Sequence, residues 1–250
     1  MRKTILVTGG TGVLGRVVVE RLLDAGHTVR LASRRERPPG TSSRAEWCTV
    51  DYRSGTSLAA AVDGADTVVL CTSSFGADVD RTVVEAAAAN GSSHVVYVSI
   101  VGVDRVPFAY YRRKLASERM IERSELPWTV LRATQFHDLV RGLFIAGARA
   151  PVMPVPAFHV QPIDVSEVGA RLAELAVAPP AGRVPDMGGP TIHHFRDLAH
   201  RYLEATGRRR RVAALRLPGK TFRRFAAGEH LAPDHAVGTI TFEQYLRSAR

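Results

Sequence analysis

The most constraining feature of the sequence is a run of glycines that follows a short apolar segment. Residues 4–8 are TILVT, and residues 9–15 read GGTGVLG, which satisfies both G-x-x-G-x-x-G and the overlapping G-x-G-x-x-G. Glycine lets the backbone turn sharply, approach a ligand closely and pack a helix onto a sheet, so the pattern predicts a strand, a tight turn and a helix. A helix that begins near Val13 directs its N–H groups and positive dipole end at a phosphate. The segment therefore predicts a dinucleotide-binding turn.

The first 133 residues alternate short β-branched runs with longer alanine-rich stretches, which is the pattern of β-α-β units. Strands are expected at 4–8, 28–33, 46–50, 67–72, 94–99 and 129–133, and helices at 13–25, 57–62, 78–90 and 108–124. Gly26, Gly64 and Gly91 mark helix ends, because glycine accepts the left-handed conformation found there. Since crossovers between parallel strands are right-handed, these units predict an α/β fold with a Rossmann-type doubly wound parallel sheet.

The end of the second expected strand indicates which dinucleotide is bound. A site specific for NAD carries an acidic residue about 20 residues after the glycines. Here Ser33, Arg34 and Arg35 occupy that region, which favours the 2′-phosphate of NADP, whereas Glu36 is a weaker indication of NAD. Asp51 follows the third strand, where its carboxylate could accept a hydrogen bond from the adenine amine; a helix cap or turn is the alternative.

Charge and composition narrow the partners. The net charge of +10 would attract nucleic acid, a membrane surface or a small anion. Arginines concentrate at 30–37 and 208–211, but no aromatic-rich platform accompanies either cluster, so we expect no nucleic-acid partner. Residues 208–211 are interpreted as a solvated turn between a helix ending at Thr206-Gly207 and a strand at 212–217.

The first ten residues hold too short an apolar run for a secretory segment or a membrane span, so we expect a cytoplasmic protein with no membrane partner. Cys48 and Cys71 lack metal-ligand spacing and are expected to be reduced thiols. The histidines are scattered, so no metal is expected. Both a monomer and a homodimer fit the sequence.

After residue 133 the alternation weakens, and proline-rich segments such as 151–156 separate shorter elements. We expect an NADP-binding Rossmann core at 1–133 and a smaller C-terminal substrate-side lobe at 134–250, packed on the core. Within the lobe a helix is expected at 165–177. Asp164 and Glu167, three residues apart at its start, are expected to form a capping box.

Several segments occur together in an order that resembles a known family. They are the TGGTGVLG loop, Asp51, Ser99 within YVSIVG, Lys114 and the PIDVSEV segment at 162–168. The chain thereby resembles an atypical short-chain dehydrogenase/reductase of the NmrA-like group, over most of its length. That group includes NADPH-dependent reductases and also NADP(H)-sensing regulators that catalyse nothing. The candidate cofactor-binding residues are Gly9, Thr11, Gly12, Val13, Leu14, Gly15, Ser33, Arg34, Arg35, Asp51, Thr72 and Lys114.

The resemblance also implies catalytic residues. Tyr110 and Lys114 form Y-x-x-x-K, which places them one helical turn apart. Similar reductases use the tyrosine as the acid that protonates a carbonyl oxygen, while the lysine holds the cofactor ribose and lowers the tyrosine pKa. Ser99, at the end of a strand, would donate a hydrogen bond to the same oxygen. Tyr111 is the next candidate for the acid, and packing of Tyr110 and Tyr111 is the structural alternative.

Substrate-side candidates follow the sixth strand and lie in the proline-rich region. They are Gln135, Phe136, His137 and Phe158. His137 is also an alternative acid or base, although a packing role fits it as well. The sequence thus predicts an NADPH-dependent oxidoreductase that reduces a carbonyl, quinone or activated double bond of a small, largely apolar molecule. The alternative is a sensor of NADP(H) that binds a partner protein.

Overall fold

The main sheet of the chain has seven strands in the order β3-β2-β1-β4-β5-β6-β9. The computed structural model describes residues 1–37, 44–52, 55, 57–72, 77–91 and 94–248. The strands are β1 (Thr4–Thr8), β2 (Thr28–Ser33), β3 (Glu46–Thr49), β4 (Thr67–Leu70), β5 (His94–Ile100), β6 (Trp128–Ala133) and β9 (Gly182–Arg183). The strand order reverses between β1 and β4, both of which pair in parallel with their neighbours. Ligands of doubly wound sheets bind at this kind of reversal.

Packing divides the chain into two units. Unit 1 comprises Met1–Ser99, Arg113–Leu131 and Val168–Val184, and unit 2 comprises Ile100–Arg112, Arg132–Glu167 and Pro185–Arg250. Four of the unit boundaries therefore fall inside elements, namely β5, α4 (Ala109–Arg123), β6 and α6 (Val165–Val177). The expected division into functional domains at residue 133 stays a prediction.

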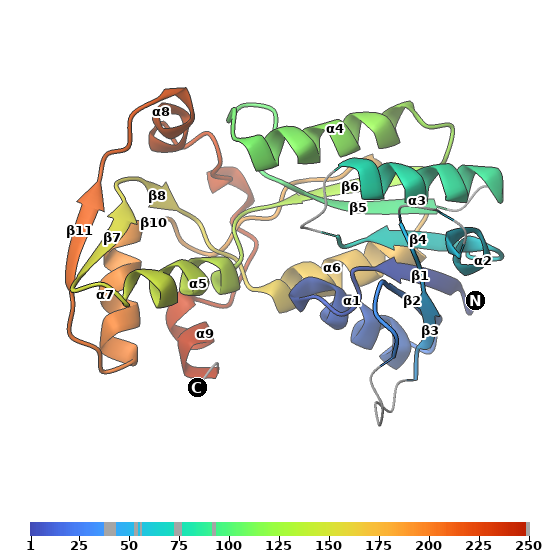
Figure 1. Cartoon of the computed structure of the whole chain (residues 1–250), viewed down its shortest axis with the longest axis horizontal. Coiled ribbons are helices and arrows are strands. Elements are labelled where there is room, and N and C mark those ends of the chain that lie inside the picture. Colours follow the sequence, from blue (N-terminus) through green and yellow to red (C-terminus); the bar gives the residue numbers. More distant parts are fainter. Residues whose placement is uncertain (38–43, 53–54, 56, 73–76, 92–93, 249–250) are drawn as a thin grey trace. The chain divides into compact units, whose positions relative to one another are not determined.

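Helices cover both faces of the sheet in unit 1 (Figure 1). The chain forms α1 (Val13–Asp24), α2 (Leu58–Val62) and α3 (Ala77–Ala89) between successive strands. On one face α1 packs against α6, where a Cβ at Gly169 would come within 2.5 Å of the Val17 side chain. On the other face α3 and α4 run side by side and cover a core that includes Leu6, Val83 and Ile121. These two layers confirm the predicted doubly wound α/β fold.

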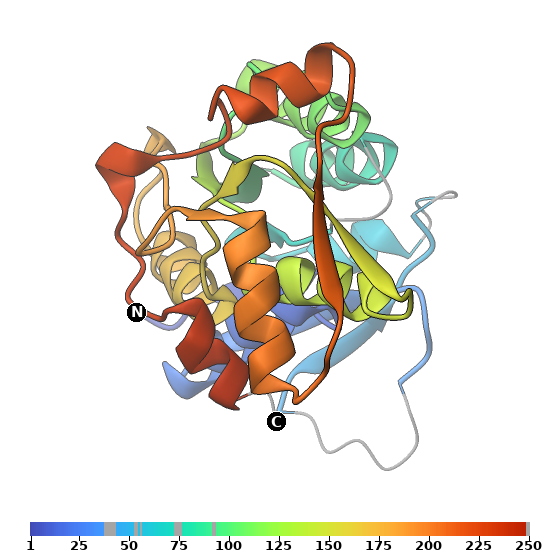
Figure 2. The ribbon, with the colours of Figure 1, turned by 90° about the vertical axis from the view of Figure 1, so that its left-hand side faces the viewer.

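Unit 2 is built from short helices and two small sheets (Figure 2). Its helices are α5 (His137–Gly147), α7 (Phe195–Ala205), α8 (Lys220–Ala226) and α9 (Phe242–Ser248), with a short 3₁₀ helix at Pro233–His235. β7 (Val152–Pro156) pairs in parallel with β11 (Arg211–Leu215), and β8 (His159–Val160) pairs antiparallel with β10 (His193–His194). Phe144, Phe195, Tyr202 and Phe242 are central to its core. In the described part of the chain, no helix is long and apolar enough to cross a membrane.

Candidate functional site

The glycine loop joins β1 to α1 at the point where the strand order reverses. Gly9 has φ +64°, and a Cβ there would lie 2.9 Å from the Cys71 carbonyl oxygen, at the end of the neighbouring strand β4. A Cβ at Gly15 would lie 2.2 Å from the Gly9 carbonyl oxygen. The first glycine therefore makes the turn, and the last one lets the first turn of α1 sit directly on the loop.

The N-terminus of α1 suits an anionic ligand. Its N-cap is Gly12, and among the described residues no side chain caps the helix and no acidic residue lies in its first turn. Thr11, Gly12 and Val13 are exposed, whereas Leu14 and Gly15 are buried. Because the first N–H groups of a helix have no partner within it, this end can donate to a pyrophosphate. The loop geometry and the uncapped N-terminus together fit a dinucleotide.

The segment after β2 holds three exposed arginines, Arg34, Arg35 and Arg37. The Arg35 N–H donates to Ser33 Oγ at 3.1 Å, and Trp47 Nε1 donates to the Arg35 carbonyl oxygen at 3.0 Å. Arg34 and Arg35 are both exposed. Asp51 is exposed too, and its backbone N–H donates a hydrogen bond to Ser57 Oγ at 3.1 Å. The predicted 2′-phosphate and adenine contacts of these residues stay predictions.

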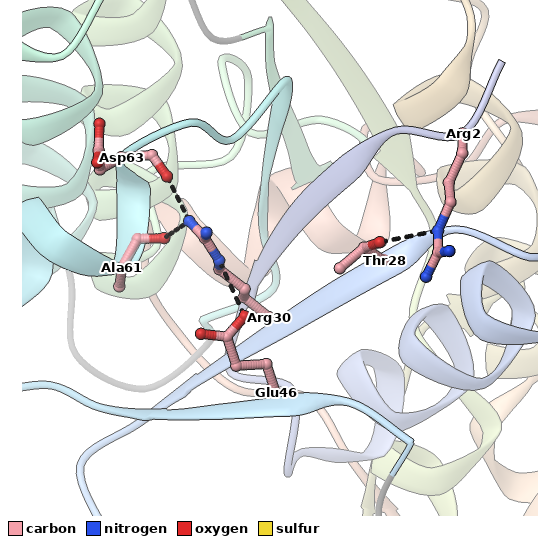
Figure 3. Close-up of polar contacts among 6 residues, drawn as sticks. All are labelled: Arg2, Thr28, Arg30, Glu46, Ala61 and Asp63. Atoms are coloured by element: carbon pink, nitrogen blue, oxygen red, sulfur yellow. Dashed lines mark hydrogen bonds and ion pairs between the residues drawn. The ribbon is translucent and has the colours of Figure 1, made fainter.

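Arg30, the first arginine of the cluster at 30–37, contacts other parts of the protein (Figure 3). Its Nε pairs with Glu46 Oε2 at 3.2 Å, and its Nη1 donates to the carbonyl oxygens of Ala61, at 3.3 Å, and Asp63. Arg30 thus ties β2 to β3 and to the end of α2. Nearby, Arg2 Nε donates to Thr28 Oγ1 at 3.0 Å. We therefore assign Arg30 to the scaffold.

Ser99 and Lys114 are buried polar residues of unit 1. Ser99 is 3% exposed, and its Oγ has no hydrogen-bond partner among the described residues. Lys114 is 6% exposed, and its Nζ lies 4.2 Å from the centre of the Tyr97 ring. Burial lowers the pKa of Lys114, and the negative charge of Asp80 opposes that shift. Burying a polar group without a partner costs about 1–3 kcal/mol, so such groups call for a functional explanation.

The structure adds Asp80 to the candidate residues. Asp80 is 3% exposed on α3 and accepts hydrogen bonds from the hydroxyls of Thr72, Ser117 and Tyr97. The hydroxyl of Thr72, a predicted cofactor contact, thus donates to a carboxylate of the protein. One sequence signal was available: Asp80 shares a helical face with Val83, Val84 and Ala87, which are all buried.

In unit 2 the two candidate acids differ in environment. Tyr111 is buried, and its hydroxyl accepts a hydrogen bond from Gln135 Nε2 at 3.2 Å. Burial raises the pKa of Tyr111 to about 12, so its hydroxyl holds its proton tightly. Tyr110 is half-buried. The hydrogen bond joins two residues that the sequence assigned separately, Tyr111 as an acid and Gln135 as a substrate contact.

An aromatic cluster of unit 2 surrounds another predicted substrate residue. Phe158 stacks on Phe225 with ring centres 5.1 Å apart, and Phe225 makes edge contacts with Phe108, Tyr111 and His230. Phe225 belongs to α8, a helix with no buried residue among the described positions. This helix lies between Gly219 and Gly228, both with positive φ. Phe225 could not be predicted from sequence, because nothing local in 220–226 indicates which aromatic side chains it contacts.

His137 and Phe136 lie at the start of α5. His137 is 1% exposed; its Nε2 donates to the Ile240 carbonyl oxygen at 3.0 Å, and its ring stacks on Tyr245. Burial lowers the pKa of His137, so the ring is neutral near pH 7. These contacts support the packing alternative, and a substrate contact by His137 stays a prediction. Phe136 is the half-buried N-cap residue of α5, and its substrate contact also stays a prediction.

The predicted capping box at the start of α6 is half right. Asp164 Oδ1 accepts a hydrogen bond from the Ser166 N–H at 2.8 Å, which confirms the cap. Glu167 instead accepts from the Thr239 N–H and hydroxyl at 2.6 and 2.7 Å. The local pattern could not reveal this, because residue 239 is 72 positions away and offers two donors.

The remaining residues to place are the possible metal ligands and the arginines at 208–211. The described residues contain no group of three or more histidine, cysteine or acidic side chains that could hold a metal. Both cysteines are free thiols. Arg208, Arg209 and Arg210 are exposed between α7 and β11, as predicted for a turn, and Gly207 has φ +65°. Arg211, which was predicted to belong to the turn, is instead the first residue of β11, and that strand ends at Leu215 where 217 was expected.

Comparison with known proteins decides the family. A family model described as NAD(P)H-binding matches residues 9–174, which include the glycine loop, Ser99 and Lys114. The chain belongs to this NAD(P)H-binding family. The match confirms the resemblance to NmrA-like, atypical short-chain dehydrogenases/reductases.

Several relatives of this NAD(P)H-binding protein are reductases. It is 33% identical over 211 residues to a (4-alkanoyl-5-oxo-2,5-dihydrofuran-3-yl)methyl phosphate reductase of Streptomyces griseus, a match that covers 82% of this chain and 74% of that protein. It is 28% identical over 160 residues to quinone oxidoreductase 2 of Escherichia coli, covering 58% of this chain and 56% of that protein.

Solved structures share the fold. The NADPH-dependent quinone oxidoreductase of Escherichia coli, complexed with NADPH, matches with a TM-score of 0.78 at 20% identity and covers 98% of this chain and 99% of its own. The triphenylmethane reductase of Citrobacter sp., complexed with NADP(H), matches with a TM-score of 0.80 at 19% identity and covers 99% and 100%.

Proposed function

We propose that this protein is an NADPH-dependent reductase of a small, largely apolar molecule with an electron-poor carbonyl, quinone or conjugated double bond. The observation that carries the proposal is the Ser99 hydroxyl, which is buried and has no hydrogen-bond partner among the described residues, in a unit that also buries the ammonium of Lys114. The named substrates of the Streptomyces griseus and Escherichia coli relatives, an oxo-dihydrofuran and a quinone, are both electron-poor ring carbonyl compounds.

NADPH, when bound, supplies a hydride from its nicotinamide ring. The protein must then bind the cofactor, polarise the acceptor and deliver a proton. In this proposal Lys114 donates to the cofactor ribose hydroxyls, Ser99 donates a hydrogen bond to the substrate oxygen, and the Tyr110 hydroxyl transfers its proton to the reduced substrate. One hydride and one proton complete the two-electron reduction.

Tyr110 is preferred over Tyr111 because of the environment of Tyr111. The Tyr111 hydroxyl accepts from Gln135, and burial raises its pKa to about 12, which makes it a poor proton donor at neutral pH. Tyr110 lies four residues before Lys114 on α4, the spacing at which two side chains share one helix face. The aromatic cluster around Phe158 and Phe225 supports a flat, apolar substrate.

Preference for NADPH over NADH rests on Arg34 and Arg35. Both are exposed directly after β2, on a backbone that the Ser33 and Trp47 side chains hold in place. A guanidinium suits a phosphate because its donors match two oxygens at once.

The test is oxidation of NADPH with a panel of quinones, aldehydes and enones, followed by the loss of reduced-nicotinamide absorbance. We expect turnover with at least one class. Tyr110→Phe should lower turnover by about 100-fold or more without changing NADPH affinity, since general acids contribute that much. Tyr111→Phe is the matched control and should lower turnover less. Tight NADPH binding without turnover on any class would support the alternative, a cofactor sensor.

A further inference from the structure

Asp80 is a buried carboxylate on the apolar face of α3. Its Oδ1 accepts from Thr72 Oγ1 at 2.7 Å, and its Oδ2 accepts from Ser117 Oγ at 2.6 Å and from the Tyr97 hydroxyl at 3.3 Å. The donors come from three places: the residues after β4, strand β5 and helix α4. Three hydroxyl donors fix both the position and the orientation of the carboxylate.

Tyr97 connects this carboxylate to Lys114. Its hydroxyl donates to Asp80, and the face of its fully buried ring lies under the Lys114 ammonium at 4.2 Å. A phenol that donates to a carboxylate has a more electron-rich ring, which strengthens its attraction for a cation on its face. Ser117 extends the network, because it follows Lys114 by three residues on α4 and also donates to Asp80.

Few other groups can balance the charge of Lys114. Cys71 faces it, but burial raises the pKa of that thiol to about 12, so the thiol is neutral near pH 7. Glu118, one turn along α4, is the other acid that faces Lys114, with a weaker effect than Asp80. Tyr52, which lies near Asp80, is also neutral, because burial raises its pKa to about 12.

The choice of lysine at this position is also informative. The chain has 31 arginines and three lysines, Lys3, Lys114 and Lys220. Of these three, Lys114 alone is buried. A lysine ammonium is compact and shifts its pKa readily on burial, whereas an arginine remains charged in any environment. The residue type at 114 is therefore one whose charge depends on its neighbours.

We propose that Asp80 is a positioning residue for Lys114: through the Tyr97 ring, Asp80 holds the Lys114 ammonium in place and supplies a negative charge opposite it. The consequence for catalysis rests on the proposed function, in which Lys114 binds the cofactor ribose. The effect on Lys114 itself does not depend on that role. The negative charge of Asp80 would then favour the charged form of Lys114, which is the form that binds the cofactor in the proposed function.

The test measures Lys114 directly in the full chain without cofactor. With [ε-¹³C]lysine labelling only three signals arise, and Lys3→Arg and Lys220→Arg assign them. We expect Asp80→Asn to lower the midpoint of the Lys114 titration by about one pH unit or more, since a nearby opposite charge shifts a pKa by that amount. Ser117→Ala removes one hydrogen bond but keeps the charge, so it should shift the midpoint less. An unchanged Lys114 midpoint in Asp80→Asn would overturn the proposal.

Tyr97→Phe keeps the ring and loses the hydroxyl, and it provides a second reading if Asp80→Asn does not fold. It should also lower the Lys114 midpoint while the Lys3 and Lys220 signals stay in place; an unmoved Lys114 midpoint contradicts the link through Tyr97. Lys114→Met separates this inference from the proposed function. If Asp80→Asn shifts Lys114 but Lys114→Met binds NADPH normally, the inference stands and the ribose role of Lys114 fails. If Lys114→Met loses affinity while Asp80→Asn leaves the midpoint unchanged, the inference fails alone.

Discussion

Replacing Gly15 with alanine tests whether the loop geometry underlies cofactor binding. The new Cβ would lie 2.2 Å from the Gly9 carbonyl oxygen and 2.7 Å from the Gly10 Cα. Because real Cβ atoms essentially never approach within 3.0 Å, helix and loop would have to separate by about 0.8 Å. Both neighbours are backbone, so no side chain can rotate away. Overpacking of this kind costs about 1–3 kcal/mol, which corresponds to between fivefold and about 150-fold in affinity if the cost falls on binding.

The assay is an NADPH titration of the Gly15→Ala protein, with its thermal unfolding measured in parallel. Gly12→Ala should have a smaller effect, because its Cβ would lie 3.2 Å from the Gly9 carbonyl oxygen. Gly142→Ala is the matched control: it is exposed on α5 with nothing within 4 Å, and alanine should stabilise the helix by about 0.5–1 kcal/mol. Wild-type affinity and wild-type Tm in Gly15→Ala would refute the reasoning.

Two further predictions concern cofactor choice and acid stability. Arg34→Ala should weaken NADPH binding by about tenfold or more and leave NADH binding nearly unchanged, with Arg81→Ala as an exposed control; equal losses for both cofactors would contradict the assignment. Burial lowers the pKa of His230 from its ordinary 6.5 to about 4. Between these two pH values the His230 ring is protonated in the unfolded chain and neutral in the folded one. Stability should fall as pH drops from about 6.5 to about 4, by up to about 1.4 kcal/mol per pH unit. His230→Gln, which keeps a donor for the His159 carbonyl oxygen, should flatten the dependence of Tm on pH in that window, and an identical slope in both proteins would count against it.

The sheet of unit 1 could be predicted closely from sequence. The bounds of β1 and β2 agree with expectation, and those of α1, α3 and α4 differ from it by one residue at an end or at both. Strands of a parallel sheet are nearly continuous apolar runs, and Gly26 and Gly91 end helices with positive φ, so both signals are local.

The structure of unit 2 was harder to predict from sequence, because its strands and aromatic side chains pair with residues far away in the chain. Residues 151–156 looked like a proline-rich separator, yet 152–156 form β7, which pairs with β11 across about 60 residues of sequence. Proline lacks the N–H that a central strand needs, but β7 has a single strand partner in its two-stranded sheet, where proline is tolerated. The stacking of Phe158 on Phe225 likewise joins segments far apart in sequence.

Asp80, which sequence reasoning missed, and Ser99, which it named as a candidate, share one physical property. Asp80 and Ser99 are polar residues at positions that the surrounding pattern reserves for apolar ones: Asp80 on a face with Val83 and Val84, and Ser99 in a strand of buried residues. A polar group at such a position lowers the stability of the fold unless hydrogen bonds compensate for its burial. Hydroxyl donors do so for Asp80, whereas Ser99 Oγ has no partner in the described structure. Local rules are expected to fail at functional sites, so Asp80, Ser99 and the buried Lys114 support the proposal that the site lies on one side of unit 1, at the ends of β4 and β5 and the facing surface of α4.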